Sequence, residues 1–174
     1  MQRNEQVKSL TQIGLFIAIV FIGVYLIKIP SPSGYSHIGD SMIMLSVLFL
    51  GTKRGAIASG IGASLADILG GYVVWALPTL CFKAVMAFVM GTMISKKVFG
   101  LKGRALWIVS AVCGGIAQAA CYTLVRAVLY GPAMAIASIA GLAFQTASGV
   151  VIALLVSEAL YKTALKNEFA FKIA

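Results

Sequence analysis

Charged side chains are scarce in this sequence. Only five of its 174 residues are acidic and fourteen are basic, so 11% are charged, whereas 60% are hydrophobic. Soluble domains carry about 25% charged residues, and a water-soluble fold of this size needs more polar surface than these side chains provide. The composition therefore excludes a water-soluble domain. Together with a mean hydropathy of +0.98, it indicates an integral membrane protein.

Residues that build metal and nucleotide sites are also scarce. There is one histidine, His37, and the three cysteines, Cys81, Cys113 and Cys121, lie in apolar runs without CxxC or CxxH spacing, so we expect no metal site. No GxxxxGK[ST] motif occurs, and the stretch "SGIGASLAD" lacks the third glycine of a dinucleotide motif. We therefore expect no cofactor and no hydrolysis of ATP by this chain itself.

What the sequence does contain is long apolar runs. A bilayer core about 30 Å thick takes about 20 apolar residues per helix. On this measure we predict an all-α membrane protein with six transmembrane helices in a single domain, residues 1–174. The predicted helices cover about 9–29, 38–51, 54–70, 76–95, 104–129 and 133–161, with Pro and Gly groups at 30–34, 70–71 and 131–132 marking turns.

The basic residues indicate the orientation of these helices. If the N-terminus is inside, the inner ends hold eleven of the fourteen basic residues and the outer connections hold none, as the positive-inside rule requires. Both termini are then cytoplasmic, and "MQRNEQVKSL" has no small-residue cleavage site after it. The net charge of +9 is dispersed in short groups, so we expect no nucleic-acid partner. The other three basic residues, Lys28, Lys83 and Arg126, are predicted to lie within or near the outer half of the membrane.

Polar residues inside a membrane are expensive and often functional. Residues four apart share a helix face, so three predicted helices each carry one polar stripe towards the outer side. The residues expected to line a site for a small, flat, polar ligand are Thr79 and Lys83, then Gln118, Tyr122 and Arg126, then Gln145 (with Ser138, Gly141 and Gly149 on its face), and in the outer loops Tyr35, His37, Tyr72 and Trp75.

Several of these residues also have a purely structural interpretation. His37 would be a loop residue or a helix-cap partner, Asp40 the N-cap of the second helix, and Asp67 the partner of Lys83 or Arg126 in a buried ion pair. Gln118 and Gln145 would bond helix to helix, and Trp75 would be an interface anchor.

Small residues recur at helical spacing in two places. Gly14 and Ala18 form a small-xxx-small pair on the first predicted helix, and the third is lined by Gly55, Ser59, Gly62 and Ala66. Small side chains let helices approach closely. We expect packing within the bundle for the third helix, whereas the first can present its face to another protein.

At these residues the chain resembles a known family. The stretch "YSHIGDSMIMLSVLFLGTKRGAIASGIGASLADILGGYVVWALPTLCFKAVMAFVMG", residues 35–91, is similar to the substrate-binding S components of energy-coupling factor (ECF) vitamin transporters. Its "HIGD", its "LG...GA...G.G..LAD...GY..W" run and the later "FQ" place it nearest the riboflavin-like, hydroxymethylpyrimidine and pyridoxine members. The resemblance covers the six-helix plan and the length of the whole chain.

The resemblance implies a function. Such proteins capture a B-vitamin or precursor on the outer side, between the last three helices and under the first, third and fifth loops, where the residues of the expected site stand. They associate with a membrane scaffold protein (T protein) and two ABC-type ATPases, and they carry the ligand inward by toppling in the bacterial cell membrane. Family members contact the scaffold through an AxxxA-like motif on the first helix, and Gly14 and Ala18 form a GxxxA variant of it.

Alternatives remain at this point. Aromatic faces and uncharged donors favour hydroxymethylpyrimidine or pyridoxine, whereas Lys83 and Arg126 keep pantothenate possible, and riboflavin is another option. An intramembrane hydrolase would use His37 as base for Ser36 or Ser41, but neither serine lies in a nucleophile-elbow sequence, so we expect no enzyme. A structural membrane subunit without a ligand is the third option.

Overall fold

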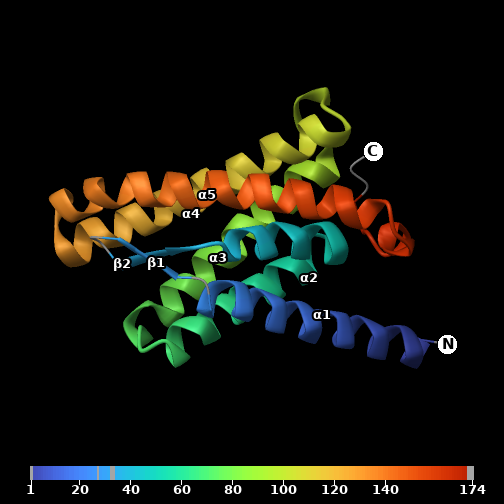
Figure 1. Cartoon of the computed structure of the whole chain (residues 1–174), viewed down its shortest axis with the longest axis horizontal. Coiled ribbons are helices and arrows are strands. Elements are labelled where there is room, and N and C mark those ends of the chain that lie inside the picture. The colour runs from blue at the N-terminus through green and yellow to red at the C-terminus, as the bar shows by residue number, and fades with distance from the viewer. Residues whose placement is uncertain (1, 27, 32–33, 172–174) are drawn as a thin grey trace.

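Five helices and one small hairpin make up the computed structural model, which describes residues 2–26, 28–31 and 34–171, and the side chains of 3–26 and 37–171. The helices are α1 (Gln2–Tyr25), α2 (Gly39–Leu69), α3 (Val73–Lys96), α4 (Gly103–Tyr130) and α5 (Pro132–Tyr161), with short 3-10 turns η1 (Val98–Gly100) and η2 (Ala164–Asn167). The strands are β1 (Lys28–Ser31) and β2 (Gly34–His37). Figure 1 shows this order along the chain.

All five helices are long and apolar enough to span a membrane, whereas the sequence predicts six such segments. The difference lies in α2, which covers both the second and the third predicted segments. It is not straight: the hydroxyl oxygens of Ser46 and Ser59 are 2.9 Å apart, although residues 13 positions apart in a straight helix are separated by about 20 Å. Helix α2 therefore consists of two arms, residues 39–50 and 52–69, that run back along each other (Figure 1).

The reversal takes place at Gly51. Its φ of 78° and ψ of −175° lie in a backbone region that is essentially restricted to glycine. The two arms then meet closely, since a Cβ on Gly55 would lie 2.9 Å from the Val47 Cα. A hydrophobicity pattern contains no signal for a change of chain direction at a single residue. The stretch "LGTKRG" therefore predicts only a break between two helices.

The strands form an antiparallel hairpin where the sequence predicts a loop with turns at 30–34. Lys28 lies opposite His37 and Ser31 opposite Gly34. Strand β2 contacts α5 and α1, and it leads directly into the first arm of α2. The hairpin therefore ends where the buried part of α2 begins.

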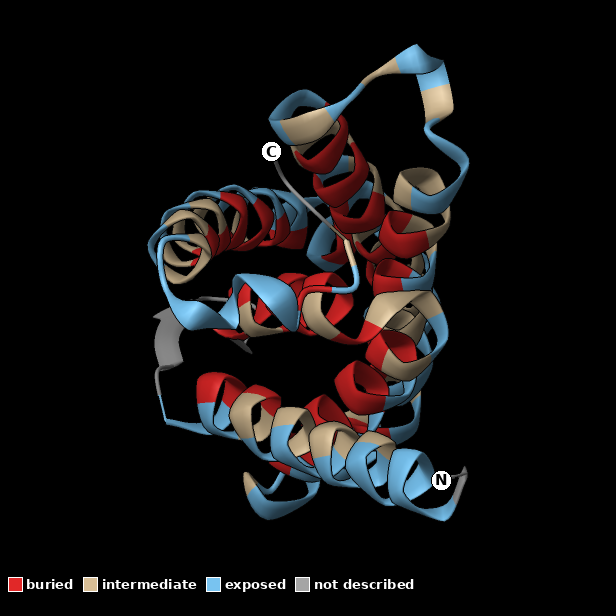
Figure 2. Cartoon of the chain, turned by 90° about the vertical axis from the view of Figure 1, so that its right-hand side faces the viewer, coloured by how far each residue is buried: buried red, intermediate tan, exposed pale blue. Residues whose placement is uncertain are grey.

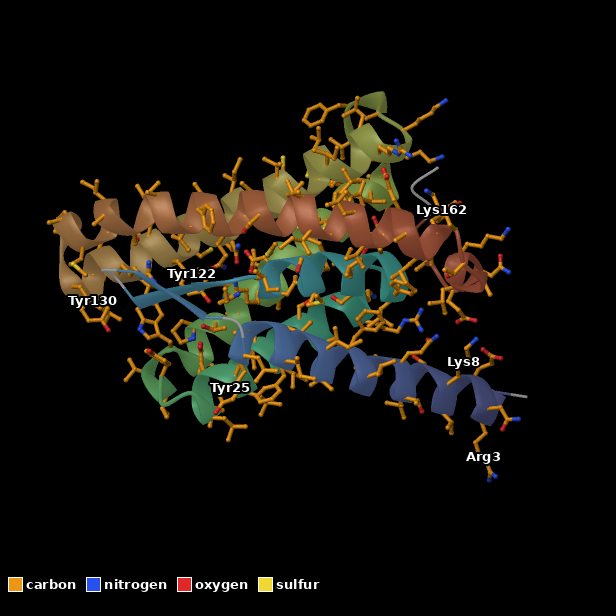
Figure 3. The ribbon with its side chains drawn as sticks, in the orientation of Figure 1. Arg3, Lys8, Tyr25, Tyr122, Tyr130 and Lys162 are labelled. Carbon is orange, nitrogen blue, oxygen red and sulfur yellow. The ribbon has the colours of Figure 1, made fainter. Side chains whose placement is uncertain are left out.

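The two ends of the bundle differ in charge. Arg3, Lys8 and Lys162 lie at one end, and Tyr130 lies at the other (Figure 3). The turn between the α2 arms belongs to the basic end, because Arg54 Nη1 donates to Ser9 Oγ at 3.2 Å. We refer to these as the basic end and the aromatic end.

The first arm of α2 is the centre of the molecule. Ile43, Met44, Val47 and Leu48 are at most 1% exposed, and α2 packs against α1, α3 and α5. Figure 2 shows the buried residues facing one another in the interior, while the outer side of α1 is exposed. Because this arm is enclosed by protein, a length of about 18 Å suffices, well short of the bilayer core.

The small residues behave as their spacing predicts. A Cβ on Gly62 would lie 2.6 Å from the Ile17 carbonyl oxygen, so α1 and the second arm pack with almost no space between backbones. Ala66 is fully buried. By contrast, a Cβ added to Gly14 would meet no atom within 4 Å, and Ala18 is exposed. The two small residues of α1 thus lie on its outer face.

The segment after α5 folds back onto the basic end. Phe169 stacks against Phe49 with ring centroids 4.0 Å apart, and the Phe171 N–H donates to the Leu48 carbonyl at 3.0 Å. Glu168 accepts hydrogen bonds from Lys8 and Gln12 of α1. This segment satisfies a carbonyl at the end of the first arm, which a helix terminus leaves without a partner.

Candidate functional site

A closed ring of three polar side chains lies in the bundle interior. Lys83 Nζ donates to Asp40 Oδ1 at 2.6 Å and to Gln118 Oε1 at 2.6 Å, and Gln118 Nε2 donates to Asp40 Oδ2. The three side chains are at most 1% exposed and come from α2, α3 and α4. We call this set the Asp40 ring. It places one ion pair and one amide among otherwise apolar helices.

The ring corrects two structural interpretations of the sequence. Asp40 is not the N-cap of the second helix, because the cap position is Ile38. Asp67 is not the partner of Lys83, since Lys83 pairs with Asp40, and no ion pair joins Asp67 to Arg126 among the described residues. Spacing alone does not reveal the pair, because Asp40 and Lys83 are 43 positions apart.

Helix α5 packs against the Asp40 ring. Gln145 is 5% exposed and approaches the Asp40 carboxylate. One turn further along α5, a Cβ on Gly149 would lie 2.9 Å from the Asp40 Cβ. Gly149 therefore lets α5 approach the start of α2, and it keeps Gln145 beside the ring. On the predicted face of α5, Ser138, Gln145 and Gly149 are buried, whereas Gly141 is only partly buried.

The polar stripes of α3 and α4 form a ladder. Lys83 contacts Gln118, Thr79 accepts a hydrogen bond from the Tyr122 hydroxyl at 2.8 Å, and Trp75 lies under the Arg126 guanidinium at 5.4 Å from the ring centroid. Each rung moves four residues back along α3 and four forward along α4, which is the step of one helix face. The stripes predicted separately from the sequence therefore meet.

Aromatic rings surround the outer rungs of this ladder. The Tyr122 ring packs edge-on against Phe82, at 4.9 Å between centroids, and lies 5.9 Å from the ring of Trp75. Trp75 also lies 6.1 Å from Tyr130 at the end of α4. Figure 3 shows Tyr122 inside the bundle and Tyr130 at its aromatic end. The site thus combines a polar inner rung with aromatic outer rungs.

The loop residues of the predicted site are less uniformly placed. His37 is buried, and its Nδ1 accepts a hydrogen bond from the Gly39 N–H at 3.1 Å, so it supports the start of α2. Tyr72 is 40% exposed. The side chain of Tyr35 lies outside the described residues. The hydroxyl of Ser41, a candidate nucleophile, donates a hydrogen bond to the Ile38 carbonyl. The side chain of Ser36, the other candidate, lies outside the described residues.

The sequence patterns do not predict three residues of this site as ligand contacts. Asp40 fits a helix cap on local rules, and Phe82 and Tyr130 belong to no polar stripe. Phe82 lies three residues beyond Thr79 and Tyr130 four beyond Arg126, so helical spacing contains the signal for both.

The arrangement can recognise a small ligand through two kinds of contact. The third N–H of Lys83 and the second N–H of Gln118 are donors that the ring does not use. Trp75 and Tyr122 offer flat faces. In the part of the chain that the structure describes, no group of three His, Cys, Asp or Glu residues is placed to hold a metal ion.

Comparison with known proteins identifies the family. A family model described as "ECF-type riboflavin transporter, S component" matches residues 4–162. An "Uncharacterized protein in gap 3'region" from Pyrococcus woesei is 37% identical over 135 residues, which cover 76% of this chain and 88% of that protein. The family match covers the whole of α3 and α4, the two helices that build the ladder. The chain therefore belongs to the S-component family of ECF-type riboflavin transporters, which comprises vitamin-transporting, multi-pass membrane subunits and is not a class of enzymes.

Proposed function

We propose that this chain is the substrate-specific subunit of an ECF-type importer and that it binds a small B-vitamin or vitamin precursor. Hydroxymethylpyrimidine and pyridoxine fit best. The observation that supports this is the ladder, because it places buried hydrogen-bond donors at its inner rung next to aromatic rings at its outer rungs. A flat heteroaromatic ring with one or two polar substituents uses both.

The ligand-binding residues of this proposal are those of the predicted site: Tyr35, His37, Tyr72, Trp75, Thr79, Lys83, Gln118, Tyr122, Arg126 and Gln145. Lys83 has a smaller part in selecting charge than the sequence suggests, since Asp40 neutralises it. Pantothenate therefore loses one of its two predicted cationic contacts. Riboflavin, which names the family, remains an alternative ligand.

The proposed transport cycle follows the family. The six predicted segments, counting the two arms of α2 separately, would place both termini in the cytoplasm of a bacterial cell, with the aromatic end outside. The chain would bind its ligand there and topple with it inward, driven by two ABC-type ATPases through a scaffold T protein.

Trp75→Ala is expected to weaken ligand binding about tenfold. An aromatic pair contributes about 0.5–1.5 kcal/mol beyond the area it buries. Trp75 belongs to the rung nearest the aromatic end of the bundle. The measurement is calorimetric titration of the purified protein with hydroxymethylpyrimidine, pyridoxine, riboflavin and pantothenate. Phe88→Ala is the matched control, because Phe88 is an exposed aromatic residue of the same helix. Failure of the unmodified protein to bind any of the four at micromolar concentration would refute the proposed function.

Ala18→Leu is expected to reduce vitamin uptake by the assembled importer while leaving ligand affinity unchanged. Ala18 and Gly14 form the small-residue pair on the outer face of α1, where a larger side chain prevents close approach of a partner helix. Co-purification with the scaffold protein measures the contact directly. Ala143→Leu adds the same bulk to an exposed position of α5 and should change neither quantity. Equal loss in both variants would contradict a specific contact at α1.

A further inference from the structure

Arg126 has an unusual charge environment for an arginine in a membrane helix. It lies on the inward face of α4, four residues from its end, and its side chain is partly covered. The five acidic residues of the chain are Glu5, Asp40, Asp67, Glu158 and Glu168. No ion pair joins Arg126 to a carboxylate among the described residues. An arginine in a membrane-spanning helix with no carboxylate partner is a candidate functional group.

Its hydrogen-bonding capacity is unused as well. A guanidinium has five N–H donors in one plane, and none of them has an acceptor among the described residues, whereas Arg54 uses two of its nitrogens. Arg126 instead lies on aromatic faces, at 5.4 Å from the Trp75 centroid and 5.9 Å from that of Tyr122. Stacking occupies the face of the guanidinium and orients it, while its edge, which carries the donors, is left for an acceptor.

The position of Arg126 relates it to the rest of the site. It shares one face of α4 with Gln118, eight residues or about 12 Å inward. At that inner rung the charges of Asp40 and Lys83 cancel. The ladder is thus neutral at its inner rung and positive at its outer rung.

We propose that Arg126 is an anion subsite of the vitamin site, and that it binds a phosphate or carboxylate group carried by a heteroaromatic ligand. This inference depends on the proposed function. It narrows the ligand class to the acidic forms of small heteroaromatic vitamins, since a planar guanidinium forms paired, charge-assisted hydrogen bonds with two oxygens of such a group. The neutral vitamin would occupy the aromatic and polar rungs only.

The test uses pairs of ligands that differ in the anionic group alone. Pyridoxine is compared with pyridoxine 5′-phosphate, hydroxymethylpyrimidine with its phosphate, and nicotinamide with nicotinate, by calorimetric titration. For at least one pair the unmodified protein should bind the acidic member tenfold or more tightly. Arg126→Gln should abolish that preference, because it should lower affinity for the acidic member at least tenfold more than affinity for the neutral member, and Arg126→Lys should retain part of it. Arg104→Gln is the matched control, because it removes the same charge from the other end of α4.

The outcomes separate the two proposals. Binding of the neutral vitamins with no preference for their acidic partners would overturn the anion subsite and leave the proposed function standing, as would a preference that persists in Arg126→Gln. Binding of no ligand at all would overturn both. A lipid phosphate is the other source of the same chemistry, so the titration is repeated in nanodiscs with and without phosphatidylglycerol. A preference that disappears when this lipid is present would assign Arg126 to the lipid headgroup and overturn its assignment to the ligand.

Discussion

Lys83→Met is expected to destabilise the protein by about 3–5 kcal/mol, because it leaves the Asp40 carboxylate charged and buried without its cation. The two groups are at most 1% exposed and 2.6 Å apart. Met keeps the length and the apolar stem of the lysine, so packing changes little. The measurement is the apparent melting temperature of the purified protein in detergent, followed by the loss of its monodisperse peak in size-exclusion chromatography.

Two further variants test the cause of this loss. Lys96→Met removes an exposed lysine from the same helix and should leave the melting temperature nearly unchanged. In the double variant Asp40→Asn, Lys83→Met neither member of the pair is charged, so much of the lost stability should return, as it does when buried ion pairs are replaced as a unit. If the double variant is less stable than Lys83→Met, the uncompensated carboxylate is not the cause.

Gly51→Ala is expected to cost about 1–3 kcal/mol, since φ 78° and ψ −175° belong to a region from which a Cβ is excluded. The nearest atom to a Cβ at this position is 3.7 Å away, so crowding does not contribute and the effect isolates backbone conformation. The same melting experiment measures it.

Gly14→Ala is the matched control for Gly51→Ala. Gly14 lies within α1 with no atom within 4 Å of an added Cβ, and alanine in a helix is more favourable than glycine by about 1 kcal/mol. The control should therefore be neutral or slightly stabilising. Comparable losses in the two variants would indicate that the reversal at residue 51 does not require a glycine.

The lengths of the apolar runs predict most of the helical residues, and the spacing of polar residues predicts the polar stripes. Gln118, Tyr122 and Arg126 share a face because they are four residues apart, and this local rule holds in any packing. The hydrogen bond between Tyr122 and Thr79 can be predicted from the same spacing if α3 and α4 are assumed to be neighbours.

The structural role of Asp40 cannot be predicted in this way. Local rules favour a carboxylate at the start of a helix as a cap, and here a tertiary interaction with Lys83 and Gln118 prevails. The hairpin of β1 and β2 escapes prediction because its strands are short and follow an apolar helix without alternation. The union of two predicted helices in α2 depends on one residue, Gly51, whose conformation leaves no periodic signal.

The Asp40 ring also bears on the order of events during synthesis. Asp40 precedes Lys83 by 43 residues and Gln118 by 78. At about 5–20 residues per second, the lysine is made about 2–9 s after the carboxylate, and the amide about 4–16 s after it. A nascent chain that holds only α1 and α2 lacks both side chains that bond Asp40 in the ring, so we expect its first arm to settle poorly in the bilayer while the carboxylate is ionised. We therefore expect the first arm of α2 to be among the last segments to reach its final environment. It would do so when α3 and α4 insert and bring Lys83 and Gln118 to Asp40.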